Sequence, residues 1–468
     1  MSLQPRQPSR QPSHQPRKDP SVDYVITDFG AVADGVTNNR EAIQTAVDKA
    51  HEAGGGRVVV PTGRFLSGAI VLKSHVTLHL ATGAWLISSL KSEDGIDFAA
   101  EFDDDTENAG WEGGCFLFAR HAEDIAIEGH GTIYGQGDKV FYDDDSDNGF
   151  HESPLAVKGA LWGRPRTTYF EDVTDLTVSG ITFRDAAFWT LHMAGCNRVR
   201  VDGIRILNDQ RAPNNDGIDP DTCKDVVITN CIVSTGDDAI VVKNTPPMAA
   251  RYGACENVVI SNCVLASRDS ALKIGTETGG AIRNVILSDC VFRDCSRGVG
   301  IWVRDGATIE DIHVHHVSGA TRQYADAYHD GRRGGWWGKG EPIFLSATPR
   351  ARPTVPHPGV IRNVTFDHIS MTSESCVFIA GEDESPIENV RITELDLTMR
   401  RQGTQPAKWF DEQPSARGLY EHEIPAVYVR AGRDVEVSGT LRREDGYAGR
   451  PLALTERSER VRVDLRER

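Results

Sequence analysis

The sequence predicts an all-β fold: a single-stranded right-handed parallel β-helix with an N-terminal α-helical cap. The first observation behind this prediction is a repeat of short apolar segments, each followed by a polar turn, at intervals of 23 to 32 residues in the central part. A period between 20 and 50 residues is typical of a solenoid. The repeated segments are Ile125–Ile127, Leu176–Val178, Val199–Val201, Val226–Ile228, Val258–Ile260, Val285–Leu287, Ile312–Val314, Val364–Phe366, Val390–Ile392 and Val435–Val437.

The second observation is what the repeats contain. Each unit has room for two or three strands and shows no helical pattern, which excludes helical repeat arrays. The intervals are unequal, whereas the blades of a propeller keep a steadier length. In a β-helix each coil stacks on the previous one, so inward residues form ladders and the turns between strands can vary in length. The longer intervals near 132–175 and 317–363 are predicted to be loops or flaps beside the helix.

One helix is predicted before the strands, from Asn39 to Ala53, because apolar residues recur there at helical spacing. The run Gly54-Gly55-Gly56 is a strong stop signal at its end. Short β segments follow at Arg57–Pro61, 69–72 and 76–80. A helix in this place would cover the open end of the sheet, whose exposed edge otherwise invites aggregation. The apolar positions of the helix are Ala42, Ile43, Ala46, Val47 and Ala50.

The chain is expected to divide into a disordered tail, residues 1–22, and a single β-helix domain, residues 23–468. The tail consists mainly of Gln, Pro, Ser and Arg, a composition that cannot form a core. It has no apolar stretch like that of a secretory signal peptide. Localisation therefore stays open between the cytoplasm and export by a route not visible in this sequence. No apolar run is long enough to span a membrane.

Charge and cysteine content exclude several classes of function. The formal net charge is −17, so the basic footprint of a nucleic-acid-binding protein is absent and an anionic membrane surface is disfavoured. The nine cysteines form no Cys-x-x-Cys pair, so a zinc site is not expected. Cys231, Cys263 and Cys290 each follow an apolar segment and a polar pair, which indicates one buried position on successive coils. Reduced, structural thiols, no metal and no cofactor are predicted, and the oligomeric state stays open.

Two acidic clusters stand out within the repeats. The stretch Asn214-Asn215-Asp216-Gly217-Ile218-Asp219 is followed by Gly236-Asp237-Asp238, and Asp216 precedes Asp238 by 22 residues. If one coil has that length, the clusters lie on neighbouring strands, roughly 4.8 Å apart. Several carboxylates would then share one surface patch, which is the arrangement that glycoside hydrolysis requires. The alternative is that Asn, Asp and Gly only form turns between strands.

These motifs resemble glycoside hydrolase family 28, the polygalacturonase family, in which Asn-Thr-Asp is followed by Gly-Asp-Asp. The resemblance extends to Asp28–Ala31, Phe188–His192 and Gly275–Gly280. It implies inverting, single-displacement hydrolysis without a metal, with Asp237 as the general acid and Asp216 and Asp238 as the pair that activates water. Carboxylates this close cannot all stay ionised, so at least one pKa rises and that group keeps its proton. Asp219 is expected to be structural.

The sequence departs from the family pattern at two motifs. The family's Gly-His-Gly falls in the slot Ser267–Gly275 and its Arg-Ile-Lys falls in Gly298–Trp302, and neither is present. In the family those basic residues hold the substrate carboxylate. Lys243, Lys273 and Arg304 are predicted replacements that can make charge-assisted contacts to a uronate. For each of them the alternative is a solvated surface cation.

Four further residues are predicted to contact the substrate. Asn214 either orients its neighbours or touches sugar, unless it only forms a turn. His192 could line the cleft, Glu277 could contact substrate, and Trp302 is predicted either to stack on a sugar or to pack under a loop. The segment Trp336–Glu341 is predicted to close one end of the groove, which would favour cleavage at chain ends or of oligosaccharides.

The predicted function is hydrolysis of an acidic, galacturonic-acid-containing poly- or oligosaccharide of the pectin type. Because the family's basic motifs are missing, a modified pectic substrate such as rhamnogalacturonan is the nearest alternative. A polysaccharide lyase on the same fold is a second possibility, and a non-catalytic carbohydrate-binding β-helix is a third.

Overall fold

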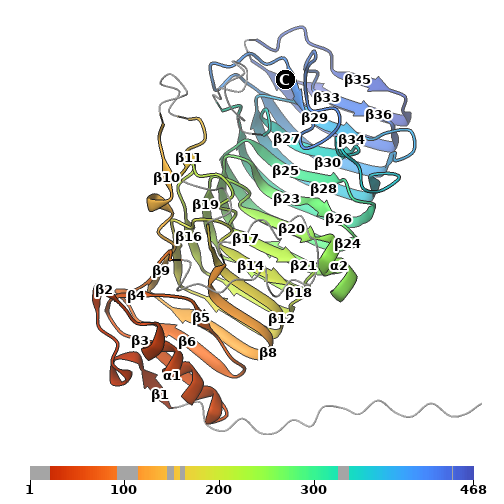
Figure 1. Ribbon diagram of the computed structural model, residues 1–468. Helices are drawn as coiled ribbons and strands as arrows, with labels where there is room; N and C mark the ends of the chain where they lie inside the picture. The colour runs from red at the N-terminus through yellow and green to blue at the C-terminus, as the bar shows by residue number, and fades with distance from the viewer. Residues whose placement is uncertain (1–21, 92–113, 145–151, 159–163, 325–336, 445) are drawn as a thin grey trace, which may run out of the picture.

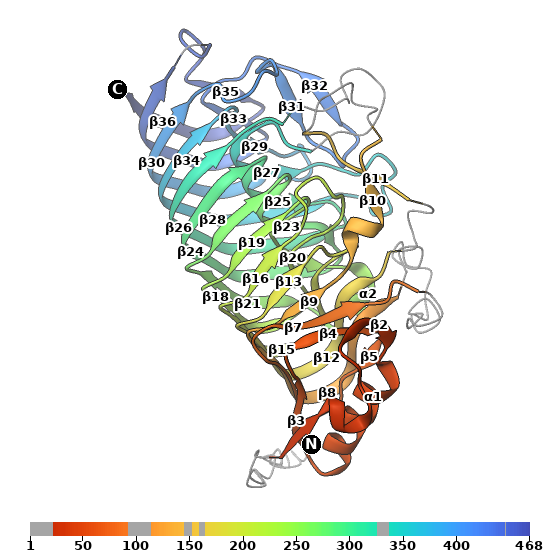
Figure 2. The same cartoon turned by 90° about the vertical axis from the view of Figure 1, so that its left-hand side faces the viewer.

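A computed structural model describes residues 22–91, 114–144, 152–158, 164–324, 337–444 and 446–468. Within these ranges 32 strands form one continuous sheet, wound into stacked coils with three faces (Figures 1 and 2). All strand pairs within this sheet are parallel, which confirms the predicted parallel β-helix architecture. The predicted tail lies outside the described residues, except for Val22.

Face 1 carries strands that stack from the bottom to the top of Figure 1. They are β5 (Ile70–Val71), the first part of β8 (Cys115–Gly129) and of β12 (Arg166–Ser179), β14 (Leu191–Ala194), β17 (Ile218–Asp221), β20 (Ile240–Asn244), β23 (Ser270–Thr278), β25 (Arg297–Val303), β27 (Glu341–Ala347), β29 (Val377–Ala380), β33 (Val427–Arg430) and β35 (Ala453–Glu456).

Face 2 contains the repeated apolar segments. Its strands are β1 (Asp23–Val25), β3 (Gly56–Val60), β6 (Val76–Leu80), the second parts of β8 and β12, β15 (Asn197–Asp202), β18 (Lys224–Thr229), β21 (Cys255–Ser261) and the first parts of β24 (Ala281–Cys295), β26 (Ala307–Thr321), β28 (Gly359–Ser373), β30 (Ile387–Met399), β34 (Gly432–Arg443) and β36 (Glu459–Glu467).

Face 3 closes each coil. Its strands are β2 (Asp34–Asn38), β4 (Gly63–Ser67), β7 (Ala84–Ser88), β9 (Thr132–Tyr134), β13 (Thr182–Arg184), β16 (Arg205–Leu207), β19 (Ile232–Thr235), β22 (Val264–Ser267) and the second parts of the long strands from β24 onward. Two antiparallel hairpins stand outside the coils, β10 (Phe141–Tyr142) with β11 (Ala156–Val157) and β31 (Trp409–Asp411) with β32 (Leu419–Glu421).

The repeated segments stack in register, as the sequence predicts. Leu176 pairs with Val199, Val199 with Val226, and Val226 with Val258. The same ladder continues through the remaining repeats to Val435. Inward residues are buried because strand side chains alternate between the two faces of the sheet. One hydrophobic cluster consequently runs from Ile26 to Leu465.

Four helical segments accompany the strands in the described ranges: η1 (Ile26–Phe29), α1 (Arg40–Glu52), η3 (Gly137–Lys139) and α2 (Pro246–Tyr252). Helix α1 is the helix predicted from Asn39 to Ala53. It buries Ile43, Ala46, Val47 and Ala50 and contacts β1, β3, β5 and β6 at the N-terminal end (Figure 1). No helix among the described residues is long and apolar enough to cross a membrane.

The two segments predicted as loops are only partly loops. β12 begins inside the first of them, at Arg166, and the whole of β27 lies inside the second. β27 pairs with β25 and β29 as a regular strand of face 1. The prediction of loops or flaps over 317–363 was therefore wrong for the residues of β27. This strand was missed because it is buried on both faces and lacks the alternation that marks a half-exposed strand. Trp162 and Trp336 lie outside the described residues.

The cysteines are free thiols, and all nine are buried. Cys231, Cys263 and Cys290 immediately precede Ile232, Val264 and Val291, which pair with one another on face 3. They therefore occupy one position on three successive coils, as predicted. Their thiols donate to backbone carbonyl oxygens two residues earlier in the chain.

The register predicts a difference between two neighbouring residues of β21. Ile260 is fully buried in the ladder, whereas Val259 is 36% exposed on the outer face. Replacing Ile260 by alanine is expected to lower the free energy of unfolding by about 2–5 kcal/mol, because it leaves a cavity. Val259→Ala is the control and should cost less than about 1 kcal/mol. Denaturant unfolding of both variants measures this, and equal losses would contradict the inward assignment.

Candidate active site

The acidic clusters lie at the turn from face 3 to face 1 on adjacent coils. Asp216 precedes β17, and Asp237 and Asp238 lie between β19 and β20. Because Ile218 of β17 pairs with Ile240 of β20, the two turns are neighbours in space. Asp216, Asp237 and Asp238 each place one carboxylate oxygen within 4.8 Å of the others. The predicted convergence of these three residues is therefore present in the structure.

Asn215 and Gly236 hold the two turns together. The Asn215 side-chain oxygen accepts hydrogen bonds from the backbone N–H groups of Gly236 (2.7 Å) and Asp237 (3.2 Å). Its side-chain amide donates to the Asp209 carbonyl at 2.8 Å. A Cβ atom at Gly236 would lie 2.1 Å from the carbonyl oxygen of Ala212, so only glycine allows this approach. The acidic side chains are thus fixed by their own backbone turns.

Burial and mutual repulsion raise the pKa values of the clustered carboxyl groups. For Asp216 burial comes first, followed by the charges of Asp237 and Asp219. For Asp219, burial raises the pKa to about 8 although Lys243 opposes it. The pKa of Asp237 is raised by burial and then by Asp269, and that of Asp238 by burial with Lys273 opposing. A group so coupled titrates as one unit, and at least one of its members keeps a proton at neutral pH.

Two lysines supply positive charge to this cluster. Lys243 Nζ lies 3.2 Å from Glu277 Oε2, 3.7 Å from Asp216 Oδ2 and 3.9 Å from Asp219 Oδ1. Lys273 Nζ lies 2.8 Å from Asp238 Oδ2 and approaches a second acid, Asp269. The two lysine side chains are only 4% and 6% exposed. Both are therefore buried partners of acids, and the alternative of a solvated surface cation does not describe them.

Asp237 differs from the other two acids. Its side chain is half-buried, whereas Asp216 and Asp238 are buried. Among the described residues no cation lies within ion-pairing distance of its carboxylate. Its oxygens accept hydrogen bonds from the backbone N–H groups of Asn214 (3.2 Å) and Asp238 (3.0 Å). Asp237 is thus the accessible member of the three. It forms no ion pair in the described part of the chain, although the charges of Lys273 and Lys243 act on it from a greater distance.

Asn214 lies in the first acidic turn, and its side chain is held by Arg164. Its backbone is left-handed (φ 58°), a conformation that Asn tolerates better than most residues. Its side-chain oxygen accepts a 2.8 Å hydrogen bond from Arg164, which also donates to the carbonyl oxygens of Ala187 and Pro213. Burial lowers the pKa of Arg164 to about 10, although Asp237 and Asp216 oppose this shift. Arg164 therefore adds a third positive charge beside the acids.

His192 lies one strand below Asp219, its register partner. Its ring packs between Tyr169 and Trp189, with both centroids 4.9 Å away, and Nε2 lies 3.6 Å from Asp221 Oδ2. Burial lowers the pKa of His192 to about 4, so the ring is neutral at pH 7. The aromatic packing does not bring His192 into contact with Asp216, Asp237 or Asp238 in the described structure.

Glu277 lies beside Lys243 and is 31% exposed. Burial acts to raise its pKa, but Lys243, Lys273 and Arg350 outweigh that effect and lower it to about 2. It is therefore an ionised acid at the edge of the cluster, accessible to solvent.

Trp302 and Arg304 do not reach the accessible surface. Trp302 is 1% exposed and packs against Phe344, with Lys273 Nζ 5.3 Å from its ring. Arg304 is also 1% exposed, and its guanidinium donates to Ser346 and to the backbone carbonyls of Pro414 and Glu412. These contacts are structural, and they leave neither side chain in a position to meet a substrate at the surface.

The missing family motifs have structural substitutes. Where Arg-Ile-Lys is expected, Gly300 lies under the indole of Trp302, and a Cβ there would meet the ring at 2.1 Å. Where Gly-His-Gly is expected, Asp269 and Lys273 lie against each other (3.8 Å) and Lys273 contacts Asp238. The indole of Trp302 therefore fills the space above Gly300 at the Arg-Ile-Lys position. At the Gly-His-Gly position the chain has the Lys273–Asp269 pair instead.

Asp216, Asp237 and Asp238 are the one group of at least three His, Cys, Asp or Glu residues in the described structure with spacing suitable for a metal ion. Their oxygens are hard ligands of the kind that Mg²⁺ and Ca²⁺ take. The ammonium groups of Lys243 and Lys273 already contact two of these carboxylates. The protein's own side chains therefore supply positive charge to two of these three acids.

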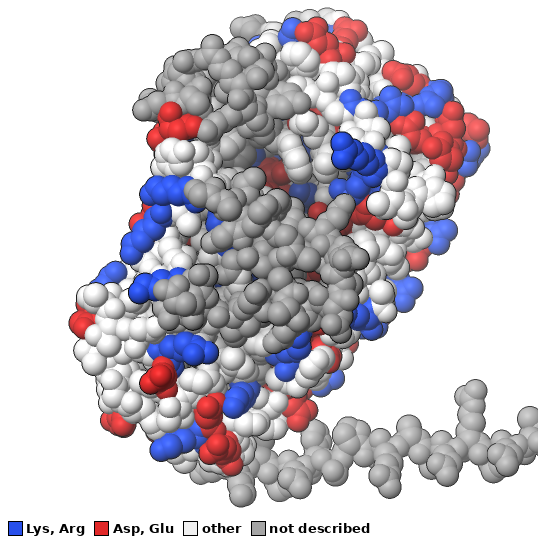
Figure 3. Space-filling model, viewed as in Figure 1, with Lys and Arg blue, Asp and Glu red and all other residues white. Residues whose placement is uncertain are grey.

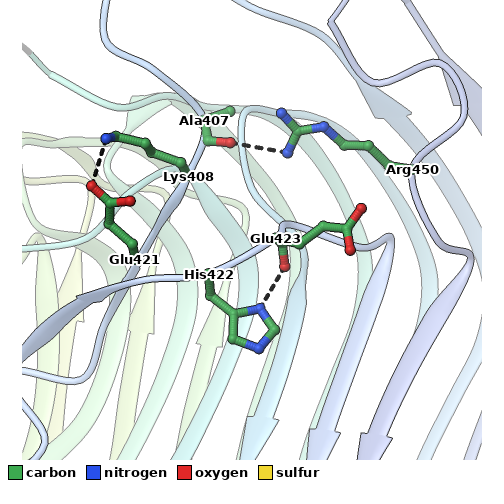
Figure 4. Close-up of a pocket in the computed structure, with 6 residues that line it drawn as sticks. All are labelled: Ala407, Lys408, Glu421, His422, Glu423 and Arg450. Carbon is green, nitrogen blue, oxygen red and sulfur yellow. Dashed lines mark hydrogen bonds and ion pairs between the residues drawn. The ribbon is translucent and has the colours of Figure 1, made fainter.

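Two hollows are visible on the molecule. Figure 3 shows a recess over the middle of face 1, near β23 and β25, with acidic and basic atoms in its depth. A separate pocket of about 430 Å³ lies near the C-terminal hairpin (Figure 4). There Lys408 pairs with Glu421 at 2.5 Å, and Arg450 donates to the Ala407 carbonyl. None of the predicted site residues lines this second pocket, whose residues are Ala407, Lys408, Glu421, His422, Glu423 and Arg450.

The family model of glycosyl hydrolases family 28 matches residues 58–321, more than half of the chain and all of the acidic turns. The chain belongs to this family. The family 28 model ends before β27, so the C-terminal coils and both strands of the β31–β32 hairpin lie outside the matched region.

The chain is similar to a curated relative in sequence and to solved structures in fold. A probable polygalacturonase of Vitis vinifera is 32% identical over 225 residues, which are 47% of this chain and 44% of that protein. The chain thus spans less than half the length of the curated relatives it matches. The fold is similar to a Yersinia enterocolitica family 28 exopolygalacturonase, with a TM-score of 0.69 and 19% identity, over 94% of this chain and 78% of that one. The fold is also similar to that of a Thermotoga maritima exopolygalacturonase, with a TM-score of 0.60 and 23% identity. This match covers 82% of this chain and 88% of that one.

Sequence reasoning missed several residues that lie around the acidic cluster. Arg164, Asn215 and Asp221 contact site residues but carry no role in the motif pattern. Arg297 immediately precedes the slot of the missing Arg-Ile-Lys and is fully buried. A charged residue at the start of an otherwise apolar strand was the available signal for Arg297.

The buried His192 makes the stability of this family 28 protein depend on pH. Its pKa of about 4 in the folded state lies below the ordinary value of 6.5. The unfolded chain therefore takes up a proton as the pH falls from about 6.5 to 4, and the folded state loses stability in that window. His192→Gln should lose less stability over the same window, by up to about 3 kcal/mol. Denaturant unfolding at pH 7 and pH 4.5 measures the difference, and parallel losses would contradict the buried neutral ring.

Proposed function

We propose that this protein hydrolyses glycosidic bonds in a galacturonic-acid-containing poly- or oligosaccharide of the pectin type. The observation that carries the proposal is the division of the three acids. Asp216 and Asp238 are buried beside lysines, whereas Asp237 is half-buried and pairs with no cation among the described residues. Family membership supports the same reaction class.

In the proposed mechanism Asp237 is the general acid. Burial raises its pKa, as it does for the other two acids, and its partial exposure is what lets it reach the leaving-group oxygen. Asp216 and Asp238 hold the attacking water and accept its proton, and Lys243 and Lys273 favour the ionised form that this requires by opposing the rise in pKa that burial causes. Water then replaces the leaving group in one displacement. The inverted configuration of the product follows from the family resemblance.

The spacing of the carboxylates is short for such a mechanism. Inverting glycosidases usually separate acid and base by about 6.5–9.5 Å, whereas retaining enzymes place them about 5–5.5 Å apart. One oxygen from each of the three carboxylates lies within 4.8 Å of one oxygen from each of the others. Inversion therefore requires that a water molecule held by Asp216 and Asp238 attacks the sugar directly. The configuration of the product distinguishes this mechanism from a retaining one.

The proposed substrate contacts are the accessible groups around the acids. They are the half-buried side chains of Asn214 and Glu277 and the ring of Trp337, which is 36% exposed and 5.7 Å from Lys273 Nζ. An exposed indole beside a catalytic cluster offers an apolar face for a sugar ring. Lys243 and Lys273 contribute their positive charge from beneath, through the acids that they contact.

A second candidate is a modified pectic substrate with fewer free carboxylates around the cleaved bond, such as a rhamnogalacturonan. The accessible groups just named are acidic or neutral, and the buried lysines are already paired. An ionised Glu277 would repel a uronate placed against it. This candidate differs from the first only in substrate and uses the same three acids.

The domain boundaries, the handedness of the β-helix and its N-terminal cap are also part of the proposal. We infer that residues 23–468 form a single right-handed β-helix domain, closed at its N-terminal end by α1. The single hydrophobic cluster and the contacts of α1 with β1, β3, β5 and β6 support this. Right-handed crossovers are the rule for parallel strands.

The proposal predicts that Asp237→Asn lowers the release of reducing ends by about 10²–10⁴-fold, because the proton donor is lost. The substrates are homogalacturonan, its methyl-esterified form and rhamnogalacturonan, and comparing them also separates the two candidates. Asp225→Asn is the control, since Asp225 is exposed and its carboxylate accepts a hydrogen bond from Asn257 away from the catalytic cluster.

Three results would contradict hydrolysis by this cluster. Unchanged activity in Asp237→Asn would remove the assigned acid. Products that absorb at short ultraviolet wavelength would identify a lyase. Binding of a pectic chain without release of sugar by the unaltered protein would identify a carbohydrate-binding β-helix.

A further inference from the structure

A chain of buried charges leads away from the catalytic cluster. Asp238 contacts Lys273 at 2.8 Å, Lys273 contacts Asp269 at 3.8 Å, and Asp269 Oδ1 lies 3.6 Å from Nη1 of Arg297. The signs alternate at every step. The most exposed of these four side chains are Lys273 and Asp269, at 6% each.

Arg297 joins this chain to residues beyond the region matched by the family model. Its Nε lies 3.4 Å from Glu341 Oε2 at the start of β27. Its Nη2 donates a 2.7 Å hydrogen bond to the backbone carbonyl of Asp411, the last residue of β31. Asp411 in turn lies 3.5 Å from Lys339 Nζ and accepts the Gly338 N–H at 2.9 Å. The side chains of Arg297, Glu341 and Asp411 are fully buried.

The register explains why these residues meet. Ser270, Arg297 and Glu341 occupy one position on three successive coils, at the start of β23, β25 and β27. Arg297 is therefore stacked directly between the coil that carries Asp269 and the coil that carries Glu341. Charges in this environment are screened little by water, so each one depends strongly on its neighbours.

We propose that Lys273 and Arg297 are positioning residues that hold Asp238 in place as an ionised base, and that strand β31 supports the catalytic cluster through Arg297. The inference rests on the proposed function, because it assigns a support to one of the acids named there. Lys273 acts on Asp238 directly, and Arg297 acts by fixing Asp269 against Lys273. The β31–β32 hairpin thereby becomes a part of the active-site architecture that the family match does not cover.

The charge on Asp238 depends on every titratable group that faces it. Lys273 opposes the rise in the pKa of Asp238 that burial causes, whereas the carboxylates of Asp216, Asp237 and Asp269 add to it. Lys243 and Asp219 interact with Asp238 from β20 and β17. Weakening the hold on Lys273 therefore shifts the balance toward protonated Asp238. The loss of ionised base appears in the acidic limb of the pH profile.

The test uses the full-length protein and the substrate that it cleaves best. Arg297→Lys keeps a positive charge but loses the fork that reaches both Asp269 and Asp411. It should lower kcat about tenfold with little change in KM. It should also shift the acidic limb of the kcat–pH profile to higher pH by about one unit. Lys273→Met should lower kcat by at least about 100-fold, and Lys273→Arg should restore part of it.

Arg430→Lys is the matched control. Arg430 is 2% exposed on the same face and is bound to Glu412, the neighbour of Asp411, but within the described structure it makes no contact with the chain of charges. It should lower the melting temperature as much as Arg297→Lys does while leaving the pH profile unchanged. Melting temperatures of all variants show that they are folded.

The outcomes separate the inference from the proposed function. If the unaltered protein cleaves no pectic substrate, the proposed function fails. If it does cleave and Arg297→Lys and Arg430→Lys both keep the unaltered pH profile, Arg297 is only structural and the inference is overturned. An Arg297→Lys protein that melts like the control but shifts its acidic limb supports the inference.

Discussion

The in-register stacking of the coils is the constraint on which the rest of the structure depends. Each strand of face 1 repeats the position of the strand below it, so Ile218 lies against Ile240 and the preceding turns meet. A separation of 22 residues between Asp216 and Asp238 in the sequence becomes a distance of at most 4.8 Å between their nearest carboxylate oxygens. The backbone makes this possible at Gly236, where a side chain would collide with the Ala212 carbonyl. The acidic cluster therefore follows from the regular repeat of the fold together with glycine at position 236.

Stacking also creates an electrostatic problem, because acids on adjacent turns are buried together. Lysine and arginine side chains from these and neighbouring coils offset the negative charge. Lys243 and Lys273 extend from the strands that follow the acidic turns, and Arg164 and Arg297 approach from coils on either side. Breaking one member of such a set leaves an uncompensated buried charge, which is more costly than the loss of an exposed ion pair. The unequal distribution of these cations distinguishes Asp237 from Asp216 and Asp238.

The fold and the acids could be predicted because both depend on local patterns. The apolar segments indicate the register of face 2, and the paired acidic turns indicate their own convergence. The environments of Arg297 and Arg304 could not be predicted in this way. Their guanidinium groups bind residues more than 100 positions later in the chain, at Asp411 and Pro414. β27 was not predicted for a different reason. A strand buried on both faces shows no alternation of apolar and polar residues.

The proposed mechanism as a whole depends on water attacking the sugar directly. Proton NMR of the first product formed from a pectic oligosaccharide measures this, because it reports the configuration of the new reducing end before it equilibrates. If Asp216 and Asp238 act together as the base, the new reducing end should have the configuration opposite to that of the cleaved bond. A retained configuration would contradict the mechanism, since one of these two carboxylates would then be a nucleophile that forms a covalent intermediate.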